Sequence, residues 1–501
     1  MASIQDLSNY NEVIEEEQTD IRTEYVEPIT SNTYKYTFRL DQTGYLDENS
    51  MLVFKLKATD GTGVYRVNNW NGALGGIKRV IFQVGDNILN DVSEIYKYAT
   101  LHNMNMNTIS RNEYLGQYLG NQLWSDVVQS SVDSSKGDAD SLAYFAQDAR
   151  QTVGSIVVDG GKSGVEFGRQ NDGNGARNCS RTITTNSANN EQYGIPLGMI
   201  IPALKGQKIP LFLFQDQRIL ITVEFNTSDF YVNDIQAGNI TYTTAGQCAD
   251  SASGAVVPDE VRLVVDYIIA PTEIQNQIIE QTKAQGGYRL EFFDVVNVEK
   301  NVVAGTDGTT QEIEHRIGQN GREVHNIVMW RETAKTNLQD GANNARNYAL
   351  TLKQHCLGFE VEEYNCNVNG RDEFQDFVSS PVAQYNEMKE VLGSDLKVDA
   401  PMYSNDSNTS STCLASSRSG LLGMMKPLGL SLSNGEPLIV GGGRQIGNYP
   451  IVWKWRRLCR NAQVENCRGT NQPVKCNYFI ELSRIANIMN TGRGTNVIVS
   501  Y

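Results

Sequence analysis

Residues 209–225 read IPLFLFQDQRILITVEF, and the second part of this stretch decides the fold. From Arg218 onward, apolar side chains occupy every second position, so that one face carries Ile219, Ile221, Val223 and Phe225. Alternation with a period of two is typical of a β-strand that buries one face and exposes the other. The stretch therefore predicts a half-buried strand.

The same alternation recurs on both sides of this stretch. It is present in residues 33–40, 51–58, 79–84 and 262–269, and again in residues 288–292, 357–361, 451–455 and 497–501. No strand-helix-strand rhythm accompanies it, which favours antiparallel sheets packed as a sandwich over a parallel sheet covered by helices. We therefore expect an all-β chain.

Three segments depart from the strand pattern. Residues 92–124 lack alternation and predict helices within one connection between strands. Residues 125–192 are rich in Ser, Asp, Gly and Asn, which indicates a projecting surface loop. After residue 271, Thr272 and Gln275 have the spacing of a capping box, which predicts a short helix.

The two halves of the chain also share short matches in the same order. Residues 197–202 match 422–427 at an offset of 225 positions. Tyr98-Ala99 matches residues 348–349, and residues 112–120 match 386–393. Each match is short enough to arise by chance, but several collinear matches at close to half the chain length predict two copies of one fold.

The charge of the chain argues against one class of function. The 501 residues include 43 Lys and Arg against 58 Asp and Glu, for a formal net charge of -15. Such a surface repels the phosphates that a nucleic-acid-coating protein contacts over a broad area, so we expect no direct binding of nucleic acid. We also find no apolar run long enough for a membrane-spanning helix and no secretory signal, so we expect synthesis in the cytoplasm.

Nearly half of this net charge lies at the N-terminus. Residues 1–27 hold eight carboxylates and one base, Arg22. A run of like charges repels itself and cannot form a core, so we expect an arm that is mobile or is ordered only by a partner. A merely solubilising terminus is the alternative. The candidate contact residues between subunits are Glu15, Glu16 and Glu17.

A series of segments around residues 195–281 resembles one protein family. An Ile-Pro-Leu at 195–197 is followed by the stretch 209–225 and then by VVDYIIAPTEIQNQIIEQ at 264–281. The series is similar to the double jelly-roll major capsid proteins of large eukaryotic DNA viruses, virophages and polinton-like viruses. The residues that carry the resemblance are Pro210, Leu211, Gln215, Ile221, Glu224, Phe225, Tyr267, Ile279, Glu280 and Gln281.

The chain also departs from that family. IPLGMIIPAL lacks the aromatic run usual after Ile-Pro-Leu, and APTE replaces the usual acidic-arginine turn after the Tyr strand. The departures indicate a diverged branch, closer to virophages than to the largest viruses.

The resemblance implies two tandem eight-stranded jelly-roll β-sandwiches with short helices and long loops inserted between strands. It divides the chain into an acidic N-terminal arm (1–28), a first jelly roll (29–271, with the insertion 92–192), a linker helix (272–285) and a second jelly roll (286–501). It further implies homotrimeric, pseudo-hexameric capsomers that tile an icosahedral shell. The partners would be neighbouring capsomers, penton and minor capsid proteins in the virion. An internal membrane is left open.

A search for catalytic and metal-binding motifs identifies none. The histidines His102, His315, His325 and His355 form no metalloprotease motif, and His355-Cys356 with Cys366 fits no familiar zinc spacing. The run GGGRQIG at 441–447 lacks the lysine of a phosphate-binding loop and predicts a turn. We therefore expect no catalytic residue, no metal and no cofactor.

One compact basic and aromatic cluster stands out, beside Trp453 and Trp455. Alternation places Lys454 and Arg456 opposite the tryptophans, which favours an ordinary exposed strand face. A contact patch for anionic lipid, nucleic acid or the acidic arm of a neighbour is the alternative. The candidate patch consists of Lys454, Arg456, Arg457 and Arg460.

Taken with the resemblance, these observations favour a structural protein over an enzyme. The alternative is a β-sandwich carbohydrate-active enzyme or a glycan-binding viral spike protein, because a pair of catalytic carboxylates depends on the fold rather than on spacing. For the structural hypothesis, we expect residues 1–27 to matter for shell formation more than for the fold of one subunit.

Overall fold

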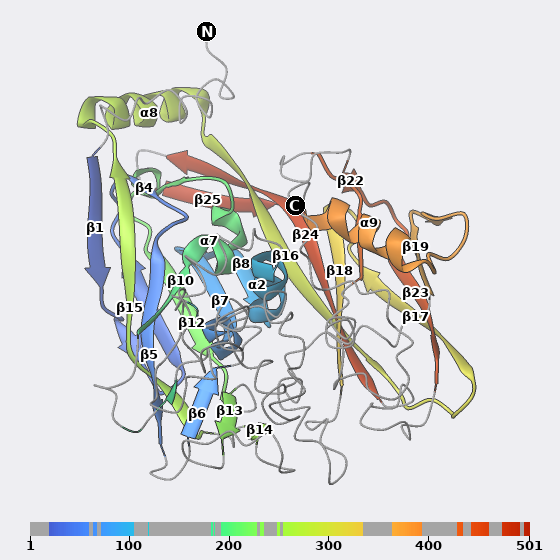
Figure 1. Cartoon of the computed structure of the whole chain (residues 1–501). Coiled ribbons are helices and arrows are strands. Elements are labelled where there is room, and N and C mark those ends of the chain that lie inside the picture. The colour runs from blue at the N-terminus through green and yellow to red at the C-terminus, as the bar shows by residue number, and fades with distance from the viewer. Residues whose placement is uncertain are drawn as a thin grey trace, which may run out of the picture.

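The computed structural model describes most of the expected β regions and omits the long insertion. The described residues are 20–59, 64–67, 72–104, 119, 182–183, 185, 192–227, 231–234, 248–250, 254–333, 363–392, 428–433, 442–459, 473–490 and 495–500. In Figure 1, the strands of the first half (blue to green) lie beside those of the second half (yellow to red).

Three sheets form the first half. Sheet A contains β10 (Gln192–Pro196), β5 (Met51–Ala58), β15 (Val256–Ile269), β4 (Tyr45–Leu46) and β11 (Ile209–Pro210), with β1 (Asp20–Val26) on the other edge of β15. Sheet B contains β2 (Thr30–Ser31), β3 (Lys35–Leu40), β12 (Ile219–Phe225), β7 (Ile77–Val84) and β8 (Asn87–Ser93). Sheet C contains β14 (Cys248–Asp250), β13 (Tyr231–Asp234), β6 (Val64–Val67) and β9 (Thr182–Ile183).

Short helical segments join these strands. They are η2 (Ala73–Gly76), α2 (Ile95–Met104), α7 (Leu197–Ile200), η9 (Pro202–Leu204) and η10 (Leu211–Leu213). The longest helix, α8 (Thr272–Gln285), leads into the second half and lies across the end of the first half in Figure 1.

Two sheets form the second half. Sheet D contains β16 (Tyr288–Val302), β24 (Val474–Asn490), β18 (Glu323–Thr333) and β21 (Leu428–Ser431), with β22 (Arg444–Gln445) paired to β18 and β25 (Thr495–Ser500) paired to β24. Sheet E contains β17 (Thr310–Gly318), β23 (Ile451–Leu458), β19 (Glu363–Val368) and β20 (Arg371–Asp372). Helix α9 (Pro381–Leu392) lies between β20 and β21 in the chain.

The strand pairing repeats one plan in both halves. The order β10-β5-β15-β1 in sheet A corresponds to β21-β18-β24-β16 in sheet D. The order β3-β12-β7-β8 in sheet B corresponds to β17-β23-β19-β20 in sheet E. Corresponding strands follow one another in the same order along the chain, and every pairing is antiparallel. Two tandem jelly rolls of eight corresponding strands are therefore confirmed.

The short sequence matches fall mostly outside the described residues. The matched segment 386–393 begins inside α9, whereas residues 112–118, 120, 348–349 and 422–427 are not described. The strand order confirms the duplication of the fold, and the residue-by-residue matches stay a prediction.

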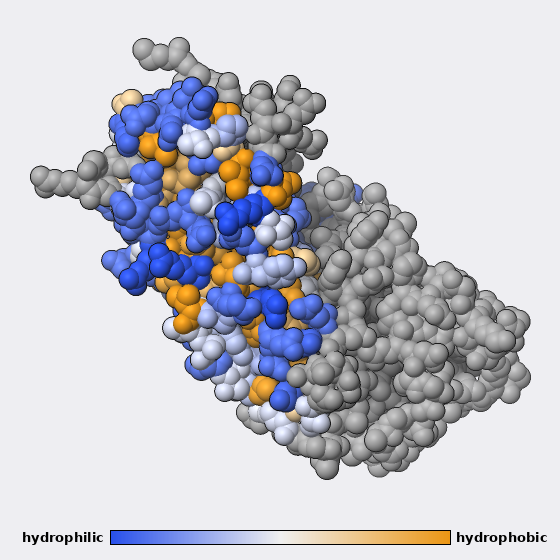
Figure 2. Space-filling model, turned by 90° about the vertical axis from the view of Figure 1, so that its left-hand side faces the viewer, coloured by the Kyte–Doolittle hydropathy of each residue, from blue (hydrophilic) through white to orange (hydrophobic). Residues whose placement is uncertain are grey.

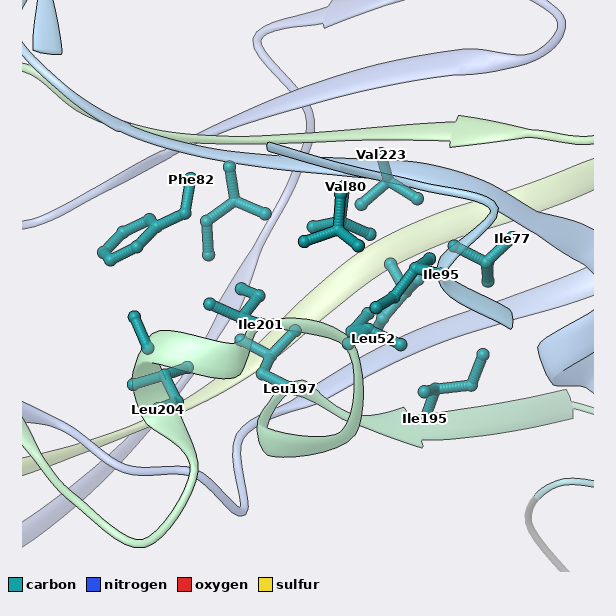
Figure 3. Close-up of a cluster of buried hydrophobic side chains, with 14 of the residues drawn as sticks. Leu52, Ile77, Val80, Phe82, Ile95, Ile195, Leu197, Ile201, Leu204 and Val223 are labelled. Carbon is teal, nitrogen blue, oxygen red and sulfur yellow. The ribbon is translucent and has the colours of Figure 1, made fainter. Parts of the chain in front are cut away.

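The core of the first half lies between sheets A and B. The alternating pattern of β12 is confirmed, because Ile219, Ile221, Val223 and Phe225 are all buried. Figure 3 shows Val223 with Val80 and Phe82 of the neighbouring strand, and Leu52 of sheet A among the same cluster of side chains. Burial of such side chains is the main favourable contribution to the stability of a sandwich.

The core of the second half is built around two tryptophans of β23. Trp453 and Trp455 are fully buried, as the alternation predicts. The ring of Trp453 stacks on Tyr364 of β19, with centroids 5.2 Å apart. Large aromatic rings in contact contribute more than their buried area alone.

The helix expected after residue 271 is present as α8, but its start differs from the expected capping box. Pro271 is the N-cap residue, and no side chain caps the helix. The side chain of Gln275 instead donates a hydrogen bond to the Ala270 carbonyl oxygen, at 2.7 Å. At the other end, Gly286 has a φ of 81°, and its left-handed conformation ends the helix.

The expected N-terminal arm is shorter than residues 1–28. Asp20–Val26 forms β1, which pairs with Ile269–Leu263 of β15 in antiparallel register. Because β1 corresponds to β16 of the second half, it is part of the first jelly roll. This segment is therefore ordered by its own chain, and no partner is needed. Part of the expected helical and loop insertion is described: α2 is a helix as expected, while residues 105–118 and 120–181 lie outside the described residues.

Candidate interaction surfaces

The described residues contain no gathering of metal ligands. No three side chains of His, Cys, Asp or Glu in these ranges could hold a metal ion. His315 Nδ1 lies 2.7 Å from the Tyr478 hydroxyl, and His325 Nε2 hydrogen-bonds to the Ser483 hydroxyl. Cys366 is buried in the second core, while His355 and Cys356 lie outside the described residues. The helices that the structure describes include none that is long and apolar enough to cross a membrane.

The family-signature residues around β4 have structural contacts. Pro210 pairs with Tyr45 of β4, and Tyr267 pairs with Leu46. The Leu211 backbone N–H donates to the Gly44 carbonyl oxygen at 2.9 Å. These residues therefore hold the short strand β4 between β11 and β15.

The remaining signature residues are spread over the first half and α8. Ile221 and Phe225 belong to the core, whereas Glu224 forms an ion pair of 3.1 Å with Lys35. The other four lie in α8 or in a turn: Ile279 is buried, Glu280 and Gln281 are exposed, and Gln215 is half-buried in the turn after η10. Burial raises the pKa of Tyr267 to about 12, which keeps its hydroxyl protonated at neutral pH.

The candidate basic patch does not form a free cationic surface. Arg456 lies between Glu312 of β17 and Glu363 of β19, with N–O distances of 2.8 and 2.6 Å. Lys454 forms an ion pair of 3.1 Å with Asp372. Each of these cations thus has a carboxylate partner within sheet E.

Arg457 corrects the prediction of a patch further, because it is fully buried. Its guanidinium donates hydrogen bonds to Gln311 Oε1 and to the Val303 carbonyl oxygen, each at 2.9 Å. It therefore anchors β23 to β17 and to the residue that follows β16. Arg460 and the arm residues Glu15, Glu16 and Glu17 lie outside the described residues.

An apolar stripe crosses the outer face of sheet A. Register places Tyr25 of β1 beside Val264, Val264 beside Met51, and Met51 beside Pro196. Ile21 lies on the same face of β1 as Tyr25, and the two side chains are 65% and 69% exposed. Figure 2 shows this side of the molecule, where apolar residues are interspersed with hydrophilic ones. We define these five residues as the outer stripe, in which Ile21 and Tyr25 are the two exposed large apolar side chains.

A second contact region lies inside the chain, where the two halves meet. One continuous apolar cluster includes Phe82 and Leu204 of the first half together with Phe292, Trp330 and Phe479 of the second. The two jelly rolls therefore share part of their core.

A group of polar side chains, the Glu481 cluster, crosses this contact. Tyr98 and His102 lie four residues apart on one face of α2, and Lys205 follows η9. The Tyr98 hydroxyl donates to Glu481 Oε1, Lys205 Nζ lies 3.3 Å from the same oxygen, and His102 Nε2 lies 3.6 Å from it. Asn326 of β18 donates to Glu481 Oε2 at 2.5 Å. Both carboxylate oxygens thus have partners.

A second group, the Asp294 cluster, crosses the same contact. Arg484 donates to Asp294 Oδ2 at 2.9 Å and to the Leu89 carbonyl oxygen at 2.7 Å. Asn90 donates to Asp294 Oδ1 at 2.8 Å and accepts a hydrogen bond of 2.9 Å from the Ala203 backbone N–H. A charged pair of the second half is therefore bonded directly to β8 and, through Asn90, to η9.

Burial and charge have opposite effects on these carboxylates. Burial alone would raise the pKa of Glu481, but Lys205, His102 and the Tyr98 hydroxyl together bring it well below its usual range. For Asp294, burial dominates and raises the pKa, although Arg484 and Asn90 oppose this. Burial and the Lys205 charge lower the pKa of His102, which favours the neutral imidazole.

Sequence reasoning did not identify these two clusters. The available signal was the presence of Glu481 and Arg484 within the otherwise apolar run of β24, where charged side chains have to be paired if they are buried.

Comparison with known proteins shows similarity at the level of structure. No model of a protein family matches the sequence, and no curated protein matches it. A solved structure of the Sputnik virophage superposes with a TM-score of 0.54 at 8% identity, covering 96% of this chain and 88% of that chain. VP54 of the virus PBCV-1, in a crystal structure fitted into a reconstruction of Sputnik, superposes with a TM-score of 0.52 at 10% identity, covering 96% and 97%. The PBCV-1 capsid model gives the same values.

These matches span both halves of the chain and agree with the strand order repeated in sheets A to E. The chain therefore has the double jelly-roll fold of these viral capsid proteins.

Proposed function

We propose that this chain is a major capsid protein, a structural subunit of an icosahedral virus shell. The observation that carries the proposal is the repeated strand plan, which superposes over nearly the whole length of capsid subunits of PBCV-1 and Sputnik. Its place is then the virion, after synthesis in the host cytoplasm. No observation on the described residues favours a carbohydrate-active enzyme or a glycan-binding spike.

The assembly unit in this proposal is a homotrimer. Two similar sandwiches in one chain supply two similar corners, so three chains around a three-fold axis form a ring of pseudo-hexagonal outline. Such rings tile a surface in contact with six neighbours. Penton and minor capsid proteins would complete the shell.

The outer stripe of sheet A supports contact between copies of this chain. Ile21 and Tyr25 expose large apolar side chains on β1, and β1 has no further strand on its outer edge among the described residues. Charged pairs, Lys55 with Glu260 and Arg262 with Glu27, lie at the rim. An apolar centre with a polar rim is the usual composition of a protein interface.

The proposal is tested by the mass and shape of the purified protein. Multi-angle light scattering should give three times the mass of one chain, and negative-stain electron microscopy should show six-cornered rings or closed shells. A protein that stays monomeric at high concentration and under several assembly conditions would contradict the proposal.

A further inference from the structure

The two halves of the chain are joined by more than apolar packing. Apolar packing is non-directional, so it specifies the relative orientation of two packed parts less strictly than hydrogen bonds do. The Glu481 and Asp294 clusters are different, because each requires donors and acceptors from both halves at fixed positions. Their geometry therefore specifies one orientation of the two jelly rolls.

We infer that the Glu481 and Asp294 clusters act together as a latch that fixes the angle between the two jelly rolls within each chain. Glu481 takes its charged and hydroxyl partners, Lys205 and Tyr98, from the first half. Arg484 bonds to Leu89 of the first half as well as to Asp294 of its own half. Rotation or sliding of one half would separate both sets of partners at once.

Burial makes this separation costly. The side chains of Asp294 and Glu481 are 5% and 7% exposed, and that of Arg484 is 10% exposed. A buried charge that loses its partner is strongly destabilising, whereas a surface ion pair contributes little. The latch is therefore stiff, unlike the ion pairs on the outside of sheet E.

Asn90 gives the latch its directionality. Its amide nitrogen donates to Asp294 Oδ1, and its amide oxygen accepts from the Ala203 backbone. A side chain that donates on one side and accepts on the other has one productive orientation. Asn90 itself is 1% exposed, so no bulk water is available to replace these bonds.

The consequence for assembly rests on the proposed function. If three chains form a six-cornered ring, the angle between the halves of each chain sets the angle between neighbouring corners. The latch would then define the ring before any two chains meet. The latch itself is a property of the single chain and can be tested apart from assembly.

The test compares two double variants of the full chain in which two carboxylates of the second half become amides. Glu481→Gln with Asp294→Asn removes the two buried negative charges of the latch and leaves Arg484 without its carboxylate partner. Glu363→Gln with Asp372→Asn is the matched control, because these carboxylates pair with Arg456 and Lys454 on the outer face of sheet E. Each protein is measured by differential scanning calorimetry and by small-angle X-ray scattering at one fixed protein concentration.

We expect the wild type and the control to unfold in one transition with one scattering profile. The latch variant should begin to unfold about 10 °C lower, in two transitions, with a larger radius of gyration in the folded baseline. Asn90→Ala, which leaves every charge in place, should also broaden the distance distribution, and it carries the test if the double variant does not fold. A latch variant and an Asn90→Ala variant with the scattering profile of the wild type would overturn the inference. Light scattering on the same samples gives the number of chains per particle, and scattering profiles are compared only between samples of equal mass, so that failure to form capsomers is distinguished from a change in the angle between the halves.

Discussion

The side-chain hydroxyl of Thr23 in β1 donates a hydrogen bond to the carboxylate of Asp266 in β15, at 2.6 Å, across two strands that are 243 residues apart in sequence. The two residues are direct partners in the register of sheet A. β1 thus forms an edge of sheet A beside β15, the last strand of the first jelly roll. The charge pattern predicts an arm at the acidic N-terminus, but from Asp20 onward this segment is part of the first β-sandwich.

This pairing predicts different effects for two N-terminal truncations. Removal of residues 1–19 should leave the free energy of unfolding unchanged, because it leaves β1 intact. Removal of residues 1–26 takes away a seven-residue strand and exposes the edge of β15, which should cost about 2 kcal/mol or more. Urea unfolding followed by circular dichroism measures both. Equal stability of the two truncations would show that β1 contributes nothing to the fold.

The sequence predicted the fold more fully than it predicted the contacts between the two halves of the chain. Strand alternation correctly identified the buried faces of β12 and β23, because a period of two directly reports which side chains are buried. Arg457 was wrongly assigned to the candidate patch, because its charge suggested exposure although the same alternation places it on the inner face. Glu481 and Arg484 were missed for a related reason: a buried charge is recognisable only when the partner from a distant segment is known. The strand pairing also shows why Tyr25 could not be identified in advance, since its neighbours Val264 and Met51 come from separate strands.

The outer stripe predicts a substitution that blocks association and leaves the fold intact. Ile21→Lys with Tyr25→Lys adds two charges to side chains that are 65% and 69% exposed in the single chain. Little burial is lost in that chain, so its midpoint of thermal unfolding should stay within about 3 °C of the wild type. Buried against another copy, two unpaired charges are costly, so the trimer peak in light scattering should decrease at least tenfold.

The matched control for the stripe lies in the second half. Val303→Lys with Tyr449→Lys likewise adds two positive charges at apolar side chains, which are 73% and 65% exposed. If copies associate through the stripe, this control should still form trimers. Unchanged trimers in the stripe variant would place the contact between copies elsewhere.

Acid should weaken the fold through its buried histidines. Burial, with the charge of Lys300 second, lowers the pKa of His315 to about 4, compared with about 6.5 in an unfolded chain. Between these values the unfolded state binds the proton more strongly, so stability falls as pH falls from about 6.5 to about 4 and is fully present above that range. His102 and His325 are shifted in the same direction, both mainly by burial. Urea midpoints at pH 7.5 and pH 5 should therefore differ, and His315→Gln should reduce the difference. A midpoint independent of pH over this range would contradict the prediction.

The turn before β4 predicts a severe effect for the smallest substitution. Gly44 has a φ of 60°, and a Cβ at this position would lie 2.4 Å from the Ile268 carbonyl oxygen, which belongs to the backbone of β15 and cannot move aside without breaking sheet A. The Gly44 carbonyl oxygen also accepts the hydrogen bond from Leu211 that holds the signature segment in place. Gly44→Ala should therefore cost about 3 kcal/mol or more of unfolding free energy. Gly308→Ala is the control, because Gly308 has a φ of 76° but no atom within 4 Å of a Cβ, so that only the backbone cost of about 1 kcal/mol remains. Equal losses in the two variants, measured by urea unfolding, would show that the contact between this turn and β15 does not constrain the first jelly roll.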